Sequence, residues 1–125
     1  MLRYGLVWAT LTCACTVVHA ENWQVVFASP QGKIFVDRST LRKEPQGLSA
    51  WFQSRYVQPV TADGVTYDTD TMRLFIHCGL WRVGKMSAFK TLHGKTVVQW
   101  QGKSAMTDII PGTPFESAAK NLCSS

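Results

Sequence analysis

The sequence predicts an α+β domain, an antiparallel sheet of about six strands with one C-terminal helix packed on it and stapled by a disulfide. Short runs rich in β-branched and aromatic residues alternate with Gly, Pro and Asp turn signals through most of the chain. The final stretch, PFESAAKNLC, instead repeats its apolar residues every three or four positions, as a helix does. Two cysteines of the folded part, Cys78 and Cys123, lie at the end of a strand and of this helix.

The first twenty residues are typical of a secretory signal peptide. Arg3 precedes an apolar run over 5–18, and small residues occupy positions 18 and 20. The run is shorter than the ~20 residues that span a bilayer. We expect cleavage after Ala20, so that 1–20 is the signal peptide, 21–125 is one domain, and no transmembrane segment follows.

Other processing routes stay open for this segment. It could remain as an uncleaved membrane anchor, or a lipid could be attached at Cys13 or Cys15. Neither cysteine has a leucine three positions before it. Cleavage is therefore the preferred interpretation.

The remaining 105 residues carry 12 Lys and Arg against 8 Asp and Glu, a formal net charge of +4. This length gives one domain. The mild positive charge favours acidic partners such as glycans, anionic lipid or acidic protein patches, and is equally consistent with solubility alone. No run of like charges resembles a nucleic-acid-binding arm, so a nucleic-acid partner is not expected.

The first half of the domain predicts three strands. WQVVFA (23–28) and KIFVD (33–37) are short β-rich runs on either side of an SPQGK turn. The polar segment 38–47 contains Pro45 and is predicted as a loop with one helical turn after Ser39. The next run, 48–59, is a long strand with Trp51, Gln53, Arg55 and Val57 on one face and Phe52, Ser54, Tyr56 and Gln58 on the other. Both faces carry aromatic rings, so it should be an interior strand.

The second half predicts a hairpin turn at Asp63-Gly64, a strand over 69–79, a strand over 80–90 with a bulge at Gly84, a turn over 92–95 and a last strand over 96–101. In the strand over 69–79, Met72, Leu74, Ile76 and Cys78 point one way, and Arg73, Phe75 and His77 the other. An extended connector over 109–114 then leads to the helix.

The helix is predicted over 114–123. Glu116 in its first turn and Lys120 near its end match the helix dipole. Phe115, Ala118, Ala119, Leu122 and Cys123 share a face. In an oxidising compartment the even pair Cys78 and Cys123 predicts a disulfide, which would hold this terminal helix to the core face of the sheet.

A basic and aromatic segment is the candidate binding surface for a macromolecule. Its residues follow one another along a strand, a turn and a strand: Trp81, Arg82, Lys85, Phe89, Lys90, Lys95, Trp100 and Lys103. Arginine and aromatic residues are enriched at protein interfaces. A solvated face over core aromatics explains the same pattern equally well.

Enzyme and metal signals are weak. The patterns GxSxG, HExxH and HxE do not occur in the domain, so we expect no enzyme. His77 and His93 could ligate haem or a metal if the fold brought them together, but ordinary strand and turn histidines are favoured. Asp68 and Asp70 could bind Ca²⁺ or transfer protons, and turn chemistry is the favoured explanation for them.

The order of several segments resembles the surface-adhesin protein E family of Gram-negative bacteria. These are Trp23, KIFVDRSTLRK (33–43), LSAWFQSRY (48–56), TYDTDTMRLFIHC (66–78), VVQWQ (97–101) and the IIPGTPFESAAKNLC tail. The resemblance implies an antiparallel sheet with a disulfide-held C-terminal helix. It also implies an outer-membrane-associated adhesin that binds host matrix proteins such as laminin and vitronectin, and plasminogen, and that has been linked to haem binding as a dimer. The name-giving member is a lipoprotein, whereas this chain has no convincing lipid-attachment cysteine. A periplasmic location is therefore favoured over attachment to the cell surface.

We therefore expect a non-enzymatic exported binding protein, in the periplasm or associated with the outer membrane, whose partner is a protein or glycan such as an extracellular matrix protein. One alternative is a periplasmic inhibitor or immunity-like protein that inserts the loop 60–67 into an enzyme. Another is a haem-binding protein. Exposed sheet edges also permit a homodimer.

Overall fold

The computed structural model describes residues 21–124 as a sheet followed by a helix. The strands are β1 (Trp23–Ser29), β2 (Gly32–Glu44), β3 (Gly47–Ala62), β4 (Val65–His77), β5 (Arg82–Leu92), β6 (Lys95–Gln101) and β7 (Thr107–Asp108), and the helix is α1 (Pro114–Cys123). The predicted signal peptide, with Cys13 and Cys15, lies outside the described residues. None of the helices in this part of the chain is both long and apolar enough to cross a membrane.

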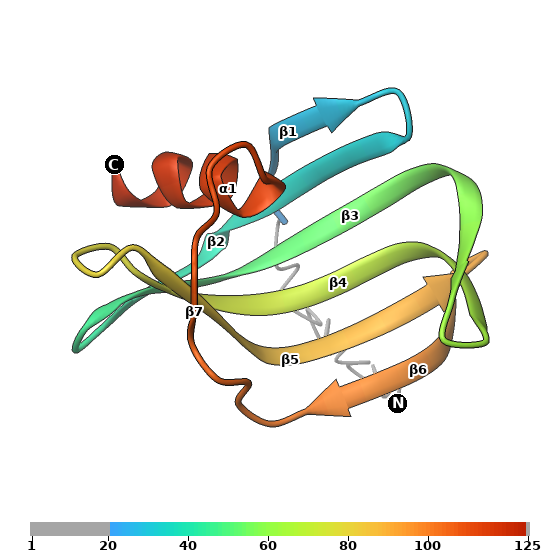
Figure 1. The fold of residues 1–125 in the computed structure, drawn as a ribbon. Coiled ribbons are helices and arrows are strands. Elements are labelled where there is room, and N and C mark those ends of the chain that lie inside the picture. Colours follow the sequence, from blue (N-terminus) through green and yellow to red (C-terminus); the bar gives the residue numbers. More distant parts are fainter. Residues whose placement is uncertain (1–20, 125) are drawn as a thin grey trace, which may run out of the picture.

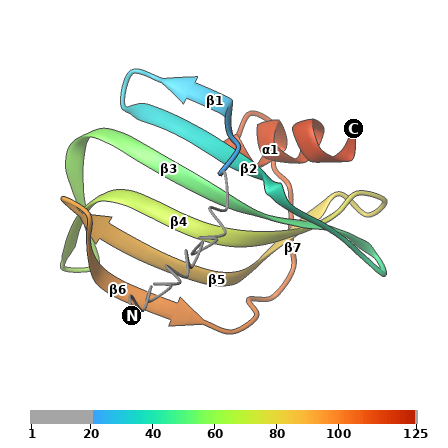
Figure 2. The same ribbon diagram turned by 180° about the vertical axis from the view of Figure 1, so that it is seen from behind.

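The strands β1 to β6 form an antiparallel meander in which each strand pairs with its neighbours in sequence (Figure 1). The short β7 pairs with β5 beyond the end of β6. The connector after β6 then runs across the sheet to α1, which lies over the end of the sheet that contains β1 and β2. Among residues 21–124, no helix lies over the opposite face, which is seen from behind in Figure 2. The predicted antiparallel sheet with a C-terminal helix is confirmed, in a molecule that is mostly sheet.

The core lies between α1 and the sheet face below it. Buried side chains from the four strands β2 to β5, the connector and the helix form it: Val36, Ala50, Phe52, Leu74, Ile76, Val83, Ile109, Ala118, Ala119 and Leu122. The predicted alternation in 69–79 is confirmed, because Leu74 and Ile76 are buried on the helix side. Burying such side chains provides the main favourable term for a domain of this size.

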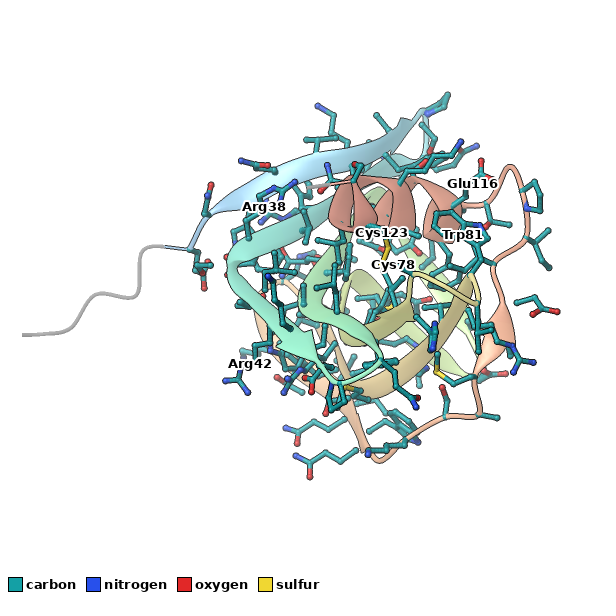
Figure 3. The ribbon with its side chains drawn as sticks, turned by 90° about the vertical axis from the view of Figure 1, so that its left-hand side faces the viewer. Arg38, Arg42, Cys78, Trp81, Glu116 and Cys123 are labelled. Atoms are coloured by element: carbon teal, nitrogen blue, oxygen red, sulfur yellow. A yellow bond between two sulfur atoms is a disulfide. The ribbon has the colours of Figure 1, made fainter. Side chains whose placement is uncertain are left out.

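A disulfide between Cys78 and Cys123 joins the residue after β4 to the last residue of α1 (Figure 3). Next to it, the Arg38 guanidinium donates to the Asn121 side-chain oxygen at 3.0 Å and so ties the end of α1 to β2. The helix begins and ends as predicted, with Thr113 as its N-cap. Of the predicted helix face, Phe115 is 41% exposed, whereas Ala118, Ala119 and Leu122 are buried.

The prediction of a loop over 38–47 was wrong, because β2 continues to Glu44. The ladder with β3 is interrupted between Asp37 and Arg42 and then resumes. Within the interruption, the buried Asp37 carboxylate accepts from the Ser39 backbone N–H at 3.0 Å. The Thr40 hydroxyl oxygen also accepts from the Trp51 N–H at 2.9 Å, in place of a strand carbonyl. Polar side chains therefore accept hydrogen bonds from backbone N–H groups inside the strand. Because these side chains are polar, the sequence of this irregular strand looks like that of a loop.

The turns were predicted better than the irregularities within strands. Asp63-Gly64 and His93-Gly94 both have positive φ at each residue and connect β3 to β4 and β5 to β6. The irregularity in β5 lies at Met86, between the pairs of Arg73 and Leu74, and not at Gly84. The two-residue strand β7 was not predicted, because so short a strand has no periodicity of its own.

Candidate binding face

The face of the sheet away from α1, here called the open face, is crossed by two rows of side chains. Paired residues of antiparallel strands point to the same face. One row runs Trp23, Asp37, Trp51, Arg73, Ser87 and Gln101, from β1 to β6. The other runs Val25, Phe35, Gln53, Thr71, Phe89 and Gln99. Large aromatic rings from β1, β2, β3 and β5 and hydrogen-bonding side chains therefore share this face of the sheet.

Two adjoining hollows lie along these rows. The larger, of about 520 Å³, is bounded by Trp23, Arg42, Trp51, Arg73 and Phe89 among others. The second, of about 360 Å³, is lined by Trp51, Ser87, Phe89, Gln99 and Gln101, together with Trp100. Trp51 and Phe89 line both hollows, and their ring centroids lie 6.1 Å apart. The hollows therefore adjoin each other at these two rings, and together they are here called the cross-strand groove.

A cation lies over the aromatic rings beside the groove. The Arg55 guanidinium lies 4.2 Å from the centroid of the Phe35 ring and 5.7 Å from that of Trp23. Its Nε also donates to the Gln53 side-chain oxygen at 2.5 Å. These contacts hold an exposed charge in a fixed place on the open face.

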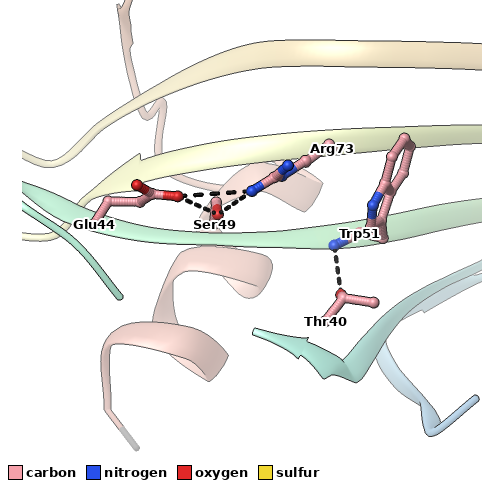
Figure 4. A network of polar contacts seen from close by, with 5 residues as sticks. All are labelled: Thr40, Glu44, Ser49, Trp51 and Arg73. Carbon is pink, nitrogen blue, oxygen red and sulfur yellow. Dashed lines mark hydrogen bonds and ion pairs between the residues drawn. The ribbon is translucent and has the colours of Figure 1, made fainter. Parts of the chain in front are cut away.

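A polar network holds Arg73, which lines the groove, in place (Figure 4). The Arg73 guanidinium donates to the Ser49 hydroxyl at 3.2 Å and lies 3.7 Å from the Glu44 carboxylate. Ser49 in turn donates to Glu44 at 3.0 Å. Because Glu44 neutralises Arg73, the exposed Arg42 contributes more of the unbalanced positive charge here. Arg42 points away from α1 (Figure 3).

The structure distributes the basic and aromatic residues predicted from β5, β6 and their flanks over several places. Lys85 lies 5.1 Å from the Trp100 ring centroid, and Lys90 lies 4.8 Å from that of Tyr67. Arg82 forms an ion pair with Asp108 at 3.2 Å. Trp81 packs against the core, Lys95 begins β6, and Lys103 lies in the segment after β6. Of the predicted residues, Lys85 is therefore brought to Trp100 and lines one hollow with Lys103, whereas Lys90 contacts Tyr67, which was not predicted.

The two histidines are not brought together. His77 pairs with Arg82 at the start of β5, whereas His93 follows its last residue, Leu92. A strand of eleven residues is about 35 Å long, too far for both histidines to bind one ion. The described residues contain no group of three or more His, Cys, Asp or Glu side chains placed to hold a metal.

The aspartates predicted to form turn structure or a site have different environments. The His93 backbone N–H donates to Asp68 at 3.0 Å and lowers the pKa of that carboxyl, which agrees with turn chemistry. Burial raises the pKa of the Asp70 carboxyl, against the opposing effect of Lys90 and Lys85. Asp70 lines a hollow of about 200 Å³ beside Phe115, and its Oδ1 is buried with no hydrogen-bond partner among residues 21–124.

Most groove residues were missed by sequence reasoning, although one signal was available. Alternation places Trp51, Gln53 and Arg55 on one face of β3, and the structure confirms it. What alternation cannot give is the register that sets Trp51 beside Arg73 and Gln53 beside Thr71.

Comparison with known proteins agrees with the fold. Three crystal structures of Haemophilus influenzae protein E resemble the chain at 10% identity. The first has a TM-score of 0.53 and covers 83% of this chain and 92% of its own. Crystal form II has a TM-score of 0.54 and covers 83% and 95%. The selenomethionine form has a TM-score of 0.53 and covers 84% and 95%.

No curated protein matches the chain in sequence. The sequence model of the family described as surface-adhesin protein E matches residues 23–124, which include every strand and the helix. The chain therefore belongs to the surface-adhesin protein E family.

Proposed function

We propose that this chain is a non-enzymatic, exported, adhesin-like protein that binds an anionic macromolecule of the host matrix or the cell envelope through its open face. Family membership supports an adhesin-like role. The observation that carries the choice of surface is the cross-strand groove, where aromatic rings and guanidinium groups share a face that α1 leaves uncovered.

Charge supports an anionic partner. The predicted mature domain has a formal net charge of +4. On the open face, Arg42 and Arg55 are exposed, while Asp37 is buried and accepts hydrogen bonds from its own neighbours. Exposed cations of this kind attract acidic partners and make binding sensitive to salt.

The test compares two double variants with equal charge change. Arg42→Gln/Arg55→Gln alters the open face, and Lys85→Gln/Lys90→Gln alters the cation–aromatic pairs of β5. Binding of residues 21–125 to immobilised basement-membrane extract is measured by surface plasmon resonance at low and high salt. We expect the wild type to bind more weakly at high salt, and only the first variant to lose affinity.

Loss of binding in the second variant alone would place the contact on the surface predicted from β5 and β6 instead. Absence of wild-type binding to the matrix extract and to outer-membrane preparations would contradict the proposed function. Thermal melting of both variants checks that folding is intact.

A further inference from the structure

We infer that the cross-strand groove is a binding site for an extended polysaccharide chain that carries carboxylate groups. This inference rests on the proposed function and names the partner's chemistry. It depends on the length, the direction and the side chains of the groove.

The groove runs across the strands. Its lining extends from Trp23 in β1 to Gln99 and Gln101 in β6. Neighbouring strands lie about 4.8 Å apart, so the five gaps between β1 and β6 give a length of about 24 Å. A groove of this length accommodates a short oligosaccharide rather than a single sugar.

The lining suits pyranose rings. A pyranose has an apolar C–H face, which stacks on aromatic rings, and a rim of hydroxyl groups, which both donate and accept hydrogen bonds. Trp23, Trp51 and Phe89 provide rings along the groove. Between and beyond them lie side chains that donate and accept: Thr71, Ser87, Thr96, Gln99 and Gln101.

The direction of the groove disfavours an added peptide strand. A peptide that binds as a strand needs the unpaired backbone groups of a sheet edge. The groove instead crosses β2 to β5, which are paired with neighbours on both sides. Recognition must therefore come from side chains, as with a sugar chain.

The charge favours sparse carboxylates over a nucleic acid. Binding a nucleic acid requires several cations along its closely spaced phosphates. In the groove, Arg73 is already paired with Glu44 at 3.7 Å, while Arg42 at one end is exposed. An arginine can bind one carboxylate with two hydrogen bonds, which suits a polymer with a carboxylate at intervals.

The experiment uses hyaluronan oligosaccharides of increasing length, because they carry carboxylates without sulfate. Tryptophan fluorescence and calorimetry follow binding to residues 21–125. We expect affinity to rise with length until the oligosaccharide fills the groove. Carboxyl-reduced hyaluronan, which has the same backbone without the charge, should bind roughly tenfold more weakly, as expected for loss of a charge-assisted contact.

Matched variants locate the site. Arg42→Gln and the double variant Gln99→Ala/Gln101→Ala should weaken binding about tenfold or more. Lys43→Gln and Gln58→Ala should not change it. Lys43 adjoins Arg42 and pairs with Leu48 on the other face, and Gln58 is exposed outside the groove lining. Because Arg42, Gln99 and Gln101 are exposed, these variants should fold.

Three results would overturn the inference. The first is absence of hyaluronan binding. The second is binding whose affinity does not change with oligosaccharide length or with the groove variants, and the third is equally strong binding of single-stranded DNA. If matrix binding still depends on Arg42 and Arg55 after enzymatic removal of matrix polysaccharides, the proposed function stands and the glycan inference is wrong. If the protein binds neither the matrix extract nor outer-membrane preparations, the proposed function fails as well.

Discussion

At the scale of single residues, buried polar groups satisfy the backbone where the sheet is irregular. Asp37 is 4% exposed and accepts from the backbone N–H groups of Asn22 and Ser39 and from the Ser39 hydroxyl. These bonds stabilise the interruption of the β2–β3 pairing between Asp37 and Arg42. Asp70 represents the opposite case, a partly buried carboxyl group whose Oδ1 is buried with no hydrogen-bond partner in the described part of the chain.

Replacing Asp37 tests the first case. Asp37→Ala leaves three donors without their acceptor and should lower the free energy of unfolding by about 2–3 kcal/mol. Asp37→Asn keeps the side-chain carbonyl oxygen and should cost less. Urea unfolding of both variants measures the difference, and equal losses would mean that the hydrogen bonds contribute little.

Replacing Asp70 tests the second case. Burial raises the pKa of its carboxyl in the folded state, so folding favours the protonated form. The contribution of protonated Asp70 to the stability of the fold is complete below the ordinary pKa of 3.8. It is lost as the pH rises through the pKa of the folded state. Asp70→Asn should therefore stabilise the protein at pH 7, by less than about 1 kcal/mol because solvent screens the group. The gain should vanish at pH 3 in parallel thermal melts, and a stability loss at pH 7 would contradict this account.

At the scale of elements, the terminal helix and the tight strand contacts are each held at particular positions. The ten-residue α1 is too short to persist alone and depends on its buried face and on Cys123. Strands also approach closely where glycine leaves room. A Cβ at Gly47 would lie 2.0 Å from the Ile76 carbonyl oxygen, whereas one at Gly64 meets nothing within 4 Å.

Removing the disulfide should release α1. The bridge closes a loop with a sequence separation of 45 residues, so Cys78→Ala/Cys123→Ala should cost about 2–4 kcal/mol. Hydrogen exchange should show α1 losing protection first, while β3 and β4 stay protected. Uniform loss across the sheet would mean that helix and sheet unfold as one unit.

The two glycines form a matched pair. Gly47→Ala places a methyl group against backbone that cannot move aside and should cost at least about 2 kcal/mol. Gly64→Ala meets open space but must adopt a φ of +75°, which costs about 1 kcal/mol. Guanidinium unfolding of both variants gives the comparison, and a milder effect at Gly47 would show that β3 and β4 shift apart easily.

At the scale of the whole molecule, the two faces of the sheet differ: one packs against α1 and forms the core, and the other is the open face. Helix, connector and disulfide gather on the first face, which frees the second for an aromatic and polar groove. Such a division suits a protein whose partner is large, because a long groove needs a floor that does not deform. The disulfide agrees with the proposed export, because disulfides persist in oxidising compartments.

Intact mass of protein purified from the cell envelope tests the proposed maturation. We expect the mass of residues 21–125 less two hydrogens, with two alkylations appearing only after reduction. A mass that includes lipid at Cys13 or Cys15, or an uncleaved leader, would contradict cleavage after Ala20.

The sequence by itself determined the elements with strong local signals. Alternation in β4 identified its core face, Asp63-Gly64 identified a hairpin, and the apolar spacing after Thr113 identified α1 with its cysteine. Each of these features is set by residues only a few positions apart, so a local sequence pattern is enough to predict it.

Only the tertiary structure decided the register and what it brings together. The extra residues in β2 and at Met86 shift the pairing, and no local pattern distinguishes an interrupted strand from a loop when side chains bond its backbone. The groove exists because Trp23, Trp51 and Phe89, from three separate strands, lie on one face. The same register places His77 and His93 at opposite ends of β5. Sequence spacing alone could not show this, because it does not encode how strands pair.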